Sequence, residues 1–178
     1  MSLPKEPLPA KLVIRFLFSD FGAQLDALRA LASDFGPMDF LSMPRDFPYT
    51  SYYDAEMGGG LRRQTAGFQR LVAQGALADI KIRTNEIEAH LLQNGKRQVN
   101  IDPGILSLER LVLATGKNFT HRIYLRDGIH ADLTLMYGKG AYRPLPWTYP
   151  DYVEPEFLHF LEVLRKKLKL QQEVTFPR

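Results

Sequence analysis

Three short clusters between residues 97 and 152 combine titratable or hydrogen-bonding side chains with proline or glycine. They are Asn100-Ile101-Asp102-Pro103-Gly104, His121-Arg122-Ile123-Tyr124-Leu125 and Leu145-Pro146-Trp147-Thr148-Tyr149-Pro150-Asp151-Tyr152. Polar side chains beside such rigid or turn-forming residues tend to hold fixed positions, which a binding or catalytic site requires. We therefore expect one polar site built from this part of the chain.

Acid–base chemistry is one activity that these residues could perform. His121 with Asp102 or Asp132 could act as an oriented general base, because a carboxylate fixes the orientation of an imidazole. A structural Asp–His pair inside a sheet is the simpler explanation. A divalent metal is a third alternative, but the sequence has no His-x-x-x-His or similar ligand spacing. Metal and cofactor therefore stay open.

Binding of a small anion, such as a nucleotide or a phosphate ester, is the function that we expect. Arg62, Arg63 and Arg122 supply positive charge, and Trp147 or Tyr149 could stack on a base. Other polar or aromatic candidates for the lining of the site are Asn100, Tyr124, His130 and Asp151. The competing explanation for the paired arginines is a flexible hairpin tip with solvated side chains. Whether the protein catalyses a reaction also stays open.

Asp102 has two alternative roles. If Asp102-Pro103-Gly104 forms a turn, the carboxylate can accept hydrogen bonds from its own turn and be purely structural. It can also point across the end of the sheet toward Arg122 or His121. We favour the second role because Asn100 lies two residues earlier, on the same face of the strand.

The elements that position these residues follow from the pattern of apolar side chains. Strands are expected at residues 11–18, 38–43, 64–71 and 97–101, with helices near 25–35 and 77–91. This strand–helix–strand–strand–helix–strand order is that of a ferredoxin-like unit. We expect an α+β fold whose antiparallel or mixed sheet has helices mainly on one face, with a C-terminal hairpin and helix added. Residues 1–10 form an extended segment and residues 11–178 a single domain.

The second half of the chain carries the stronger turn signals. The Asp127-Gly128 pair joins two strands, residues 121–126 and 129–137, in a predicted hairpin. Other expected features are a turn at 102–104, a short helix capped by Ser107, a loop over 45–60, a strand at 141–145, an extended segment at 147–152 and a final helix from Pro155.

The hairpin register decides which side chains share a face. His130, Asp132 and Thr134 alternate along one strand and share its polar face. His121 joins that face if the turn has two residues, whereas Arg122 and Tyr124 join it if the turn has an odd number. The sequence leaves this choice open.

Composition sets the outer limits. The 178 residues are 45% hydrophobic and 24% charged, which is ordinary for a globular domain. The absence of cysteine excludes disulfides and thiolate metal sites and suits the cytoplasm. We expect no signal peptide and no membrane association. The basic run Arg165-Lys166-Lys167-Leu168-Lys169 keeps a non-catalytic RNA-binding or protein-interaction module as the alternative function. The oligomeric state is open.

Several motifs together resemble a known family. Glu56-Met57-Gly58, Lys81 with Thr84-Asn85-Glu86, Arg97 through Gly104, the His121 cluster and residues 145–152 resemble the prokaryotic domain-of-unknown-function family 4416. The resemblance runs from about Lys11 into the last helix. Because the family has no established activity, it implies no catalytic residues. Some members carry a GTP-binding label, but this chain has neither a Gly-Lys-Ser/Thr phosphate loop nor an Asn-Lys-x-Asp motif.

Overall fold

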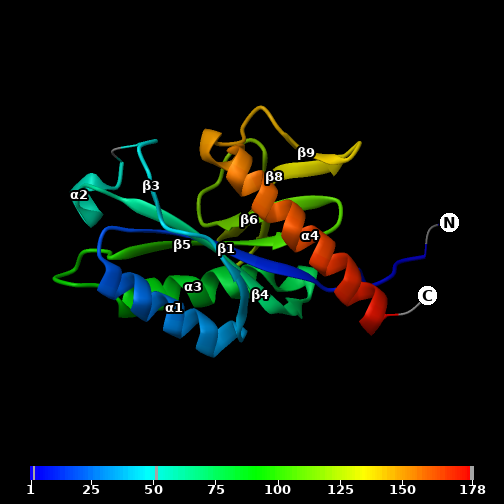
Figure 1. Ribbon diagram of the computed structural model, residues 1–178, viewed down its shortest axis with the longest axis horizontal. Coiled ribbons are helices and arrows are strands. Elements are labelled where there is room, and N and C mark those ends of the chain that lie inside the picture. The colour runs from blue at the N-terminus through cyan, green and yellow to red at the C-terminus, as the bar shows by residue number, and fades with distance from the viewer. Residues whose placement is uncertain (2, 51, 177–178) are drawn as a thin grey trace.

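A nine-stranded antiparallel sheet forms the centre of the molecule (Figure 1). The computed structural model describes residues 1, 3–50 and 52–176. Seven strands follow one another in the order β2-β4-β1-β5-β6-β8-β7, while β3 pairs with β4 and β9 pairs with β8. The strands are β1 (Ala10–Phe18), β2 (Met38–Leu41), β3 (Arg45–Asp46), β4 (Arg62–Val72), β5 (Val99–Leu106), β6 (Arg110–Thr115), β7 (Arg122–Arg126), β8 (Ile129–Gly138) and β9 (Ala141–Pro144). The predicted α+β class is confirmed.

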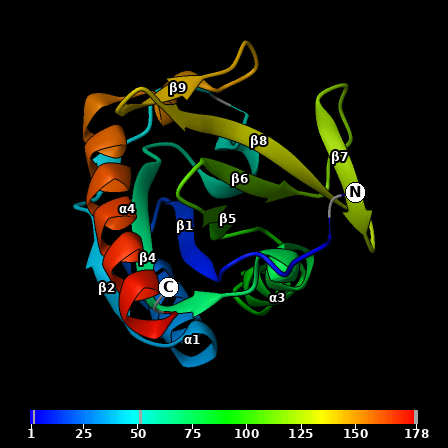
Figure 2. The same ribbon diagram turned by 90° about the vertical axis from the view of Figure 1, so that its right-hand side faces the viewer.

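Three long helices cover the two faces of the sheet. The helical segments are α1 (Phe21–Phe35), α2 (Asp54–Met57), η1 (Gln74–Ala76), α3 (Leu77–His90), η2 (Pro150–Tyr152) and α4 (Pro155–Thr175). Figures 1 and 2 show α1 and α3 on one face and α4 against the other. We call these the α1/α3 face and the α4 face. None of the described helices combines the length and the hydrophobicity that crossing a bilayer requires.

The central strand β1 is buried throughout, so its alternate side chains build two cores. Leu12, Ile14, Phe16 and Phe18 pack in one cluster with residues of α1 and α3. Val13 lies in another cluster with residues of α4. A strand that is covered on both faces has this nearly continuous apolar sequence, which is why β1 was predictable.

Close packing of α4 depends on a glycine in β4. A Cβ atom at Gly67 would lie 2.6 Å from Cδ2 of Leu164 in α4. Leu164 is fully buried, together with Leu161 and Leu168 of the same helix. The glycine therefore allows the apolar stripe of α4 to approach the sheet backbone.

The segment around Asp102 is not a turn, so that prediction was wrong. Asp102 lies inside β5, opposite Arg15 of β1. The chain turns later, where Ser107 N bonds to Arg110 O, and then forms β6 in place of the predicted short helix. β6 pairs with β5 only from Gly104 to Leu106. Pro103 therefore lies where β5 has no partner strand on that side, and its missing N–H breaks no ladder bond.

The β7–β8 hairpin is confirmed. Asp127 and Gly128 connect the two strands with φ angles of 51° and 76°, as a type I′ turn requires. A bulge between Tyr124 and Arg126 changes the parity, so Arg122 and Tyr124 lie opposite Asp132 and His130. The two-residue turn therefore does not place His121 on the polar face by strand parity.

Two further predictions need correction. The expected loop over residues 45–60 contains the short strand β3 and the one-turn helix α2. The expected extended segment at 147–152 is extended at Tyr149, with φ −65° and ψ 144°, but ends in the 3-10 turn η2.

Candidate functional site

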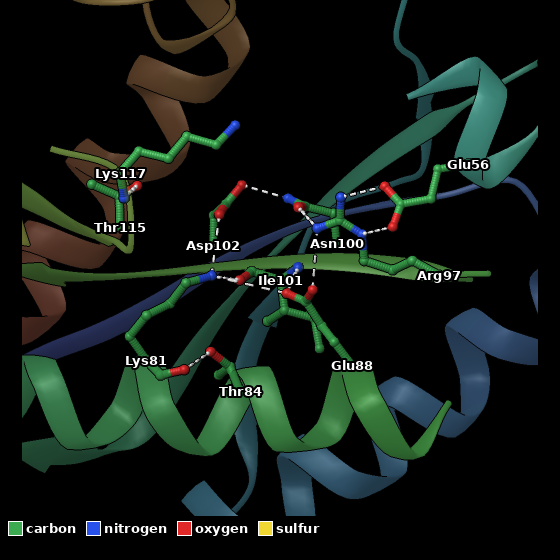
Figure 3. A network of polar contacts seen from close by, with 10 residues as sticks. All are labelled: Glu56, Lys81, Thr84, Glu88, Arg97, Asn100, Ile101, Asp102, Thr115 and Lys117. Atoms are coloured by element: carbon green, nitrogen blue, oxygen red, sulfur yellow. Dashed lines mark hydrogen bonds and ion pairs between the residues drawn. The ribbon is translucent and has the colours of Figure 1, made fainter. Parts of the chain in front are cut away.

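The separation of β6 from β5 leaves one edge of β5 open, and a network of charged side chains surrounds this edge (Figure 3). We call this group the β5-edge network. Its members are Glu56 of α2, Lys81 and Glu88 of α3, Arg97, and Asn100 and Asp102 of β5.

Two charged residues of α3 bind the unpaired backbone of Ile101. Lys81 Nζ donates to the Ile101 carbonyl oxygen at 2.6 Å, and the Ile101 N–H donates to Glu88 Oε1 at 2.7 Å. Lys81 and Glu88 lie seven residues apart, so they occupy the same face of the helix two turns apart. Burial raises the pKa of Glu88, although the positive charge of Lys81 opposes the shift. These two residues replace the missing partner strand.

Arg97 connects this edge to the segment before β4. Its guanidinium donates to both carboxylate oxygens of Glu56, at 3.1 and 2.7 Å, and also to Asn100 Oδ1 at 2.7 Å. It also lies 5.6 Å from the ring of Tyr53. Burial, with the nearby charge of Asp102, raises the pKa of Tyr53 to about 12. All these contacts hold α2 beside the open edge of β5.

Asp102 is the point at which the network reaches solvent. Asn100 Nδ2 donates to Asp102 Oδ2 at 2.7 Å, and Lys81 Nζ lies 3.5 Å from Oδ1. The Asp102 side chain is 39% exposed, compared with 11% for Glu88. The carboxylate therefore keeps accessible lone pairs that could accept further hydrogen bonds.

Lys117, which follows β6, is a cation on the same side of β5 as the Asp102 side chain. Figure 3 shows both side chains on the side of β5 that faces away from α3. Its ammonium lies 4.7 Å from the ring centroid of Tyr52 and 3.5 Å from the Tyr52 hydroxyl. Among the side chains that the structure describes, no carboxylate lies within ion-pair distance of Lys117.

Two buried arginines hold the segment that precedes α4 against the sheet. Arg15 Nη1 lies 3.1 Å from Asp151 Oδ2, and Arg63 Nη1 lies 3.8 Å from the same oxygen. Arg63 also pairs with Glu154. Burial, followed by the repulsion of Arg15, lowers the pKa of Arg63, while burial raises the pKa of Asp151. Because Arg15 is the cross-strand partner of Asp102, this group continues the β5-edge network across the α4 face.

The β7–β8 hairpin contributes a histidine that contacts an aspartate. His121 Nε2 lies 3.1 Å from Asp132 Oδ2, and Arg122 Nε donates to the same oxygen at 2.9 Å. Trp147 stacks on the His121 ring, with centroids 4.7 Å apart and planes inclined by 11°, and its own N–H donates to the Leu133 carbonyl. The side chains of His121, Arg122 and Asp132 are each about 90% buried. His121 reaches Asp132 from just outside the strand.

The structure brings most of the predicted site residues into contact with one another, in three separate clusters. These are Asn100 with Asp102, then His121 with Arg122, Asp132 and Trp147, and finally Arg63 with Asp151. Tyr149 is 59% exposed. Three other residues lie elsewhere: Arg62 stacks on Phe21, and Tyr124 packs against His130 near the hairpin tip. The structure gives His121 a contact with Asp132 and none with Asp102.

Several residues of this surface escaped sequence reasoning. They are Arg15, Glu56, Lys81, Glu88, Arg97 and Lys117. Arg15 was detectable, because it is a charged residue in the middle of the apolar run at residues 12–18. The seven-residue spacing of Lys81 and Glu88 could have indicated that they share one face of the predicted helix. Lys117 had no such signal.

The described residues form no metal centre, and the arginines of the cavity on the α4 face are all paired. Within residues 1, 3–50 and 52–176, no three His, Asp or Glu side chains converge as metal ligands. A cavity of about 160 Å³ lies beside Arg15, Arg45 and Arg63. Its arginines pair with Asp151, Glu156 and Glu154 respectively.

Comparison with known proteins identifies the family. A model of a domain of unknown function, DUF4416, matches residues 8–168. The chain belongs to the DUF4416 family. Searches of curated proteins and of solved structures found no match. The DUF4416 match includes the β5-edge network, the hairpin and the segment before α4, and the family is uncharacterised.

Proposed function

We propose that the surface around Asp102 binds a small anionic ligand, a nucleotide or a phosphate ester. The observation that carries the proposal is the placement of Lys117, a cation with no ion pair among the described side chains, on the same side of β5 as the exposed carboxylate of Asp102 (Figure 3). The ligand's negative group binds Lys117 and its hydroxyl or N–H groups donate to Asp102. The sequence predicted Arg62, Arg63 and Arg122 as the source of positive charge, but these pair with Asp46, Glu154 and Asp132, and we assign the role to Lys117.

Exposed aromatic side chains, of which Tyr52 contacts Lys117, support a ligand with a planar ring. Tyr52 is 65% exposed, Tyr149 is 59% exposed and Trp147 is 36% exposed. Exposed aromatic rings next to polar groups are typical of ligand sites, because one ring face can bind a base while the polar groups fix its orientation. This favours a nucleotide over a simple phosphate ester.

His121 with Asp132 is the acid–base pair that we assign to any reaction at this surface. Asp132 fixes the ring through Nε2, at 3.1 Å. The other ring nitrogen, Nδ1, makes no hydrogen bond to a described residue and could exchange a proton with a ligand. The simpler structural role for this pair predicts no effect of His121 on turnover.

We also infer that the first half of the chain is a ferredoxin-like unit, which the order β1-α1-β2-β4-α3-β5 and the neighbouring strands β2-β4-β1-β5 support. A location in the cytoplasm, supported by the lack of cysteine, is part of the same proposal.

The alternative function, an RNA-binding or protein-interaction module, has one observation in its favour. Ile123 and Tyr124 of the edge strand β7 are 69% and 61% exposed, and Phe119 just before it is 61% exposed, as in a surface that contacts a partner. The RNA form is less supported, because Arg165 donates to Leu108 O and Lys167 pairs with Asp39. If RNA binds, its affinity should fall steeply with salt.

A thermal-shift screen tests the leading proposal. Nucleotides and phosphorylated metabolites are added with and without Mg²⁺, and at least one should raise the melting temperature in a saturable way. Lys117→Gln should reduce the affinity for that compound by about tenfold, the loss of a charge-assisted contact. Lys166→Gln removes the same charge from an exposed position on α4 and should change nothing. No stabilisation by any compound would contradict the proposal, as would equal effects of the two substitutions.

A further inference from the structure

A groove on the α1/α3 face lies apart from the Asp102 surface. It has a volume of about 310 Å³ and runs between the start of α3 and the β7–β8 hairpin. Ile105 of β5 lines it, whereas Asp102, three residues earlier, points to the other face, because side chains alternate along a strand. The groove and the Asp102 surface are therefore on opposite sides of the sheet.

Apolar residues from several strands and a helix form the floor and one wall of the groove. Ile105 of β5 and Val112 of β6 are cross-strand partners, and Ala131 of β8 continues the same face. Leu77 and Ala78, at the start of α3, form the wall. Helix α3 begins at Leu77 and does not cover the sheet beyond this point, and Ala78 and Ala131 have small side chains. A space is therefore left above the strands that no side chain of the described chain fills.

One positive charge at the rim is left without an ion pair. Arg126 pairs with both Asp79 and Asp127, so its charge is compensated. Arg110, which also lines the groove, is exposed and makes no ion pair with any residue that the structure describes. An apolar floor with an uncompensated guanidinium at its edge is complementary to a molecule that has an apolar body and one anionic end.

We propose that this groove binds a small amphipathic carboxylate. Its volume corresponds to about ten water molecules at ~30 Å³ each, which allows a ligand of about ten non-hydrogen atoms. A medium-chain fatty acid fits this limit, whereas a long-chain lipid does not. The carboxylate binds Arg110 at the rim, and the alkyl chain lies over Ile105, Val112 and Ala131.

Titration of the full-length ¹⁵N-labelled protein with octanoate tests this proposal by NMR. Saturable shifts should appear at Ala78, Val112 and Ala131, with a Kd on the order of 1 mM, as expected for a ligand of this size. Octanol has the same chain without the charge and should bind about fivefold more weakly. Arg110→Gln should reduce octanoate binding by about the same factor and leave octanol binding unchanged, while Arg29→Gln on α1 serves as the charge-matched control.

Two variants that fill the groove complete the test. Ala131→Leu fills it from the floor, and Gly75→Leu fills it from the rim, where an added Cβ meets no atom within 4 Å. Either variant, if its spectrum shows the native fold, should abolish the octanoate shifts. Absent or unsaturable shifts, shifts confined to the Asp102 face, or octanoate binding that survives both folded variants would overturn the proposal. Groove shifts that depend on protein concentration without octanoate would show a second copy of the chain as the occupant and would overturn it too.

Discussion

Lys81 and Glu88 are buried charged residues that form hydrogen bonds with the backbone of Ile101. Lys81→Met leaves the Ile101 carbonyl without its donor and removes one of the two cations, Lys81 and Arg97, that lie within ion-pair distance of Glu88. Removing one member of a buried charged group usually costs about 3 kcal/mol, so this variant should lose that much free energy of unfolding in urea. Arg83→Met, on the exposed side of the same helix, should lose less than about 1 kcal/mol. Equal losses would contradict the assigned role of Lys81.

The pH dependence of stability should report the burial of Glu88. Its pKa is raised above the usual 4.5, so the folded protein takes up this proton more readily than the unfolded chain. The contribution of Glu88 to the free energy of unfolding is therefore highest below pH 4.5 and falls as pH rises through the pKa of the folded state.

Glu88→Gln removes the contribution of Glu88 to the pH dependence of stability. The glutamine keeps an oxygen that can accept the hydrogen bond from the Ile101 N–H. The free energy of unfolding of the wild type minus that of the variant should decrease between about pH 4 and pH 8. Urea titrations across this range measure it. A difference that grows with pH would show that Lys81 and Arg97 outweigh the burial of the carboxylate.

At the scale of elements, the contact between α4 and β4 depends on the missing side chain of Gly67. Gly67→Ala places a methyl group 2.6 Å from Leu164 Cδ2, so α4 must shift. Overpacking of this kind costs about 1–3 kcal/mol, to be measured by chemical denaturation. Gly59→Ala, where the added atom meets nothing within 4 Å, is the control and should stay within about 0.5 kcal/mol of the wild type. A neutral Gly67→Ala would show that α4 packs more loosely than described.

The sequence predicted those elements that depend on local signals. The Asp127-Gly128 turn, the apolar strand β1 and the helices α1, α3 and α4 follow from turn chemistry or periodicity. The Asp102-Pro103-Gly104 segment has equally strong turn residues yet forms a strand. Its conformation depends on β1 pairing on one side and on α3 side chains on the other, and such long-range contacts leave no local signal.

The candidate site was predictable to a similar degree. Asn100 with Asp102 could be anticipated from strand spacing, whereas His121 with Asp132 was proposed from residue types, and His121 reaches Asp132 from outside the strand. The bulge at Leu125, which reverses the parity of the hairpin, could not. Lys117 also escaped, because its place on the same side of β5 as Asp102 depends on β6 separating from β5 after only three paired positions.

At the scale of the whole molecule, the two ends of the chain are tied together. Gln172 of α4 donates to the Pro9 carbonyl at 2.8 Å, and Gln171 donates to the Gln69 carbonyl at 2.9 Å. α4 also closes the apolar cluster on its face of the sheet. We therefore expect one cooperative unfolding transition and one protease-resistant core of about residues 11–169. A chain truncated after Val153 should expose that cluster and fail to fold. Two independently stable fragments would contradict this single-unit description.

The central claim is that Asp102 belongs to a binding surface and is not merely structural. Asp102→Asn keeps an oxygen that can accept from Asn100, and the carboxylate is 39% exposed, so the melting temperature should change little. Calorimetric titration with the compound that most stabilises the wild type should show affinity reduced by about tenfold, because the charged acceptor is lost. Asp26→Asn, which removes an exposed charge on α1, is the control and should bind as the wild type does. Unchanged affinity in a folded Asp102→Asn variant would contradict the claim.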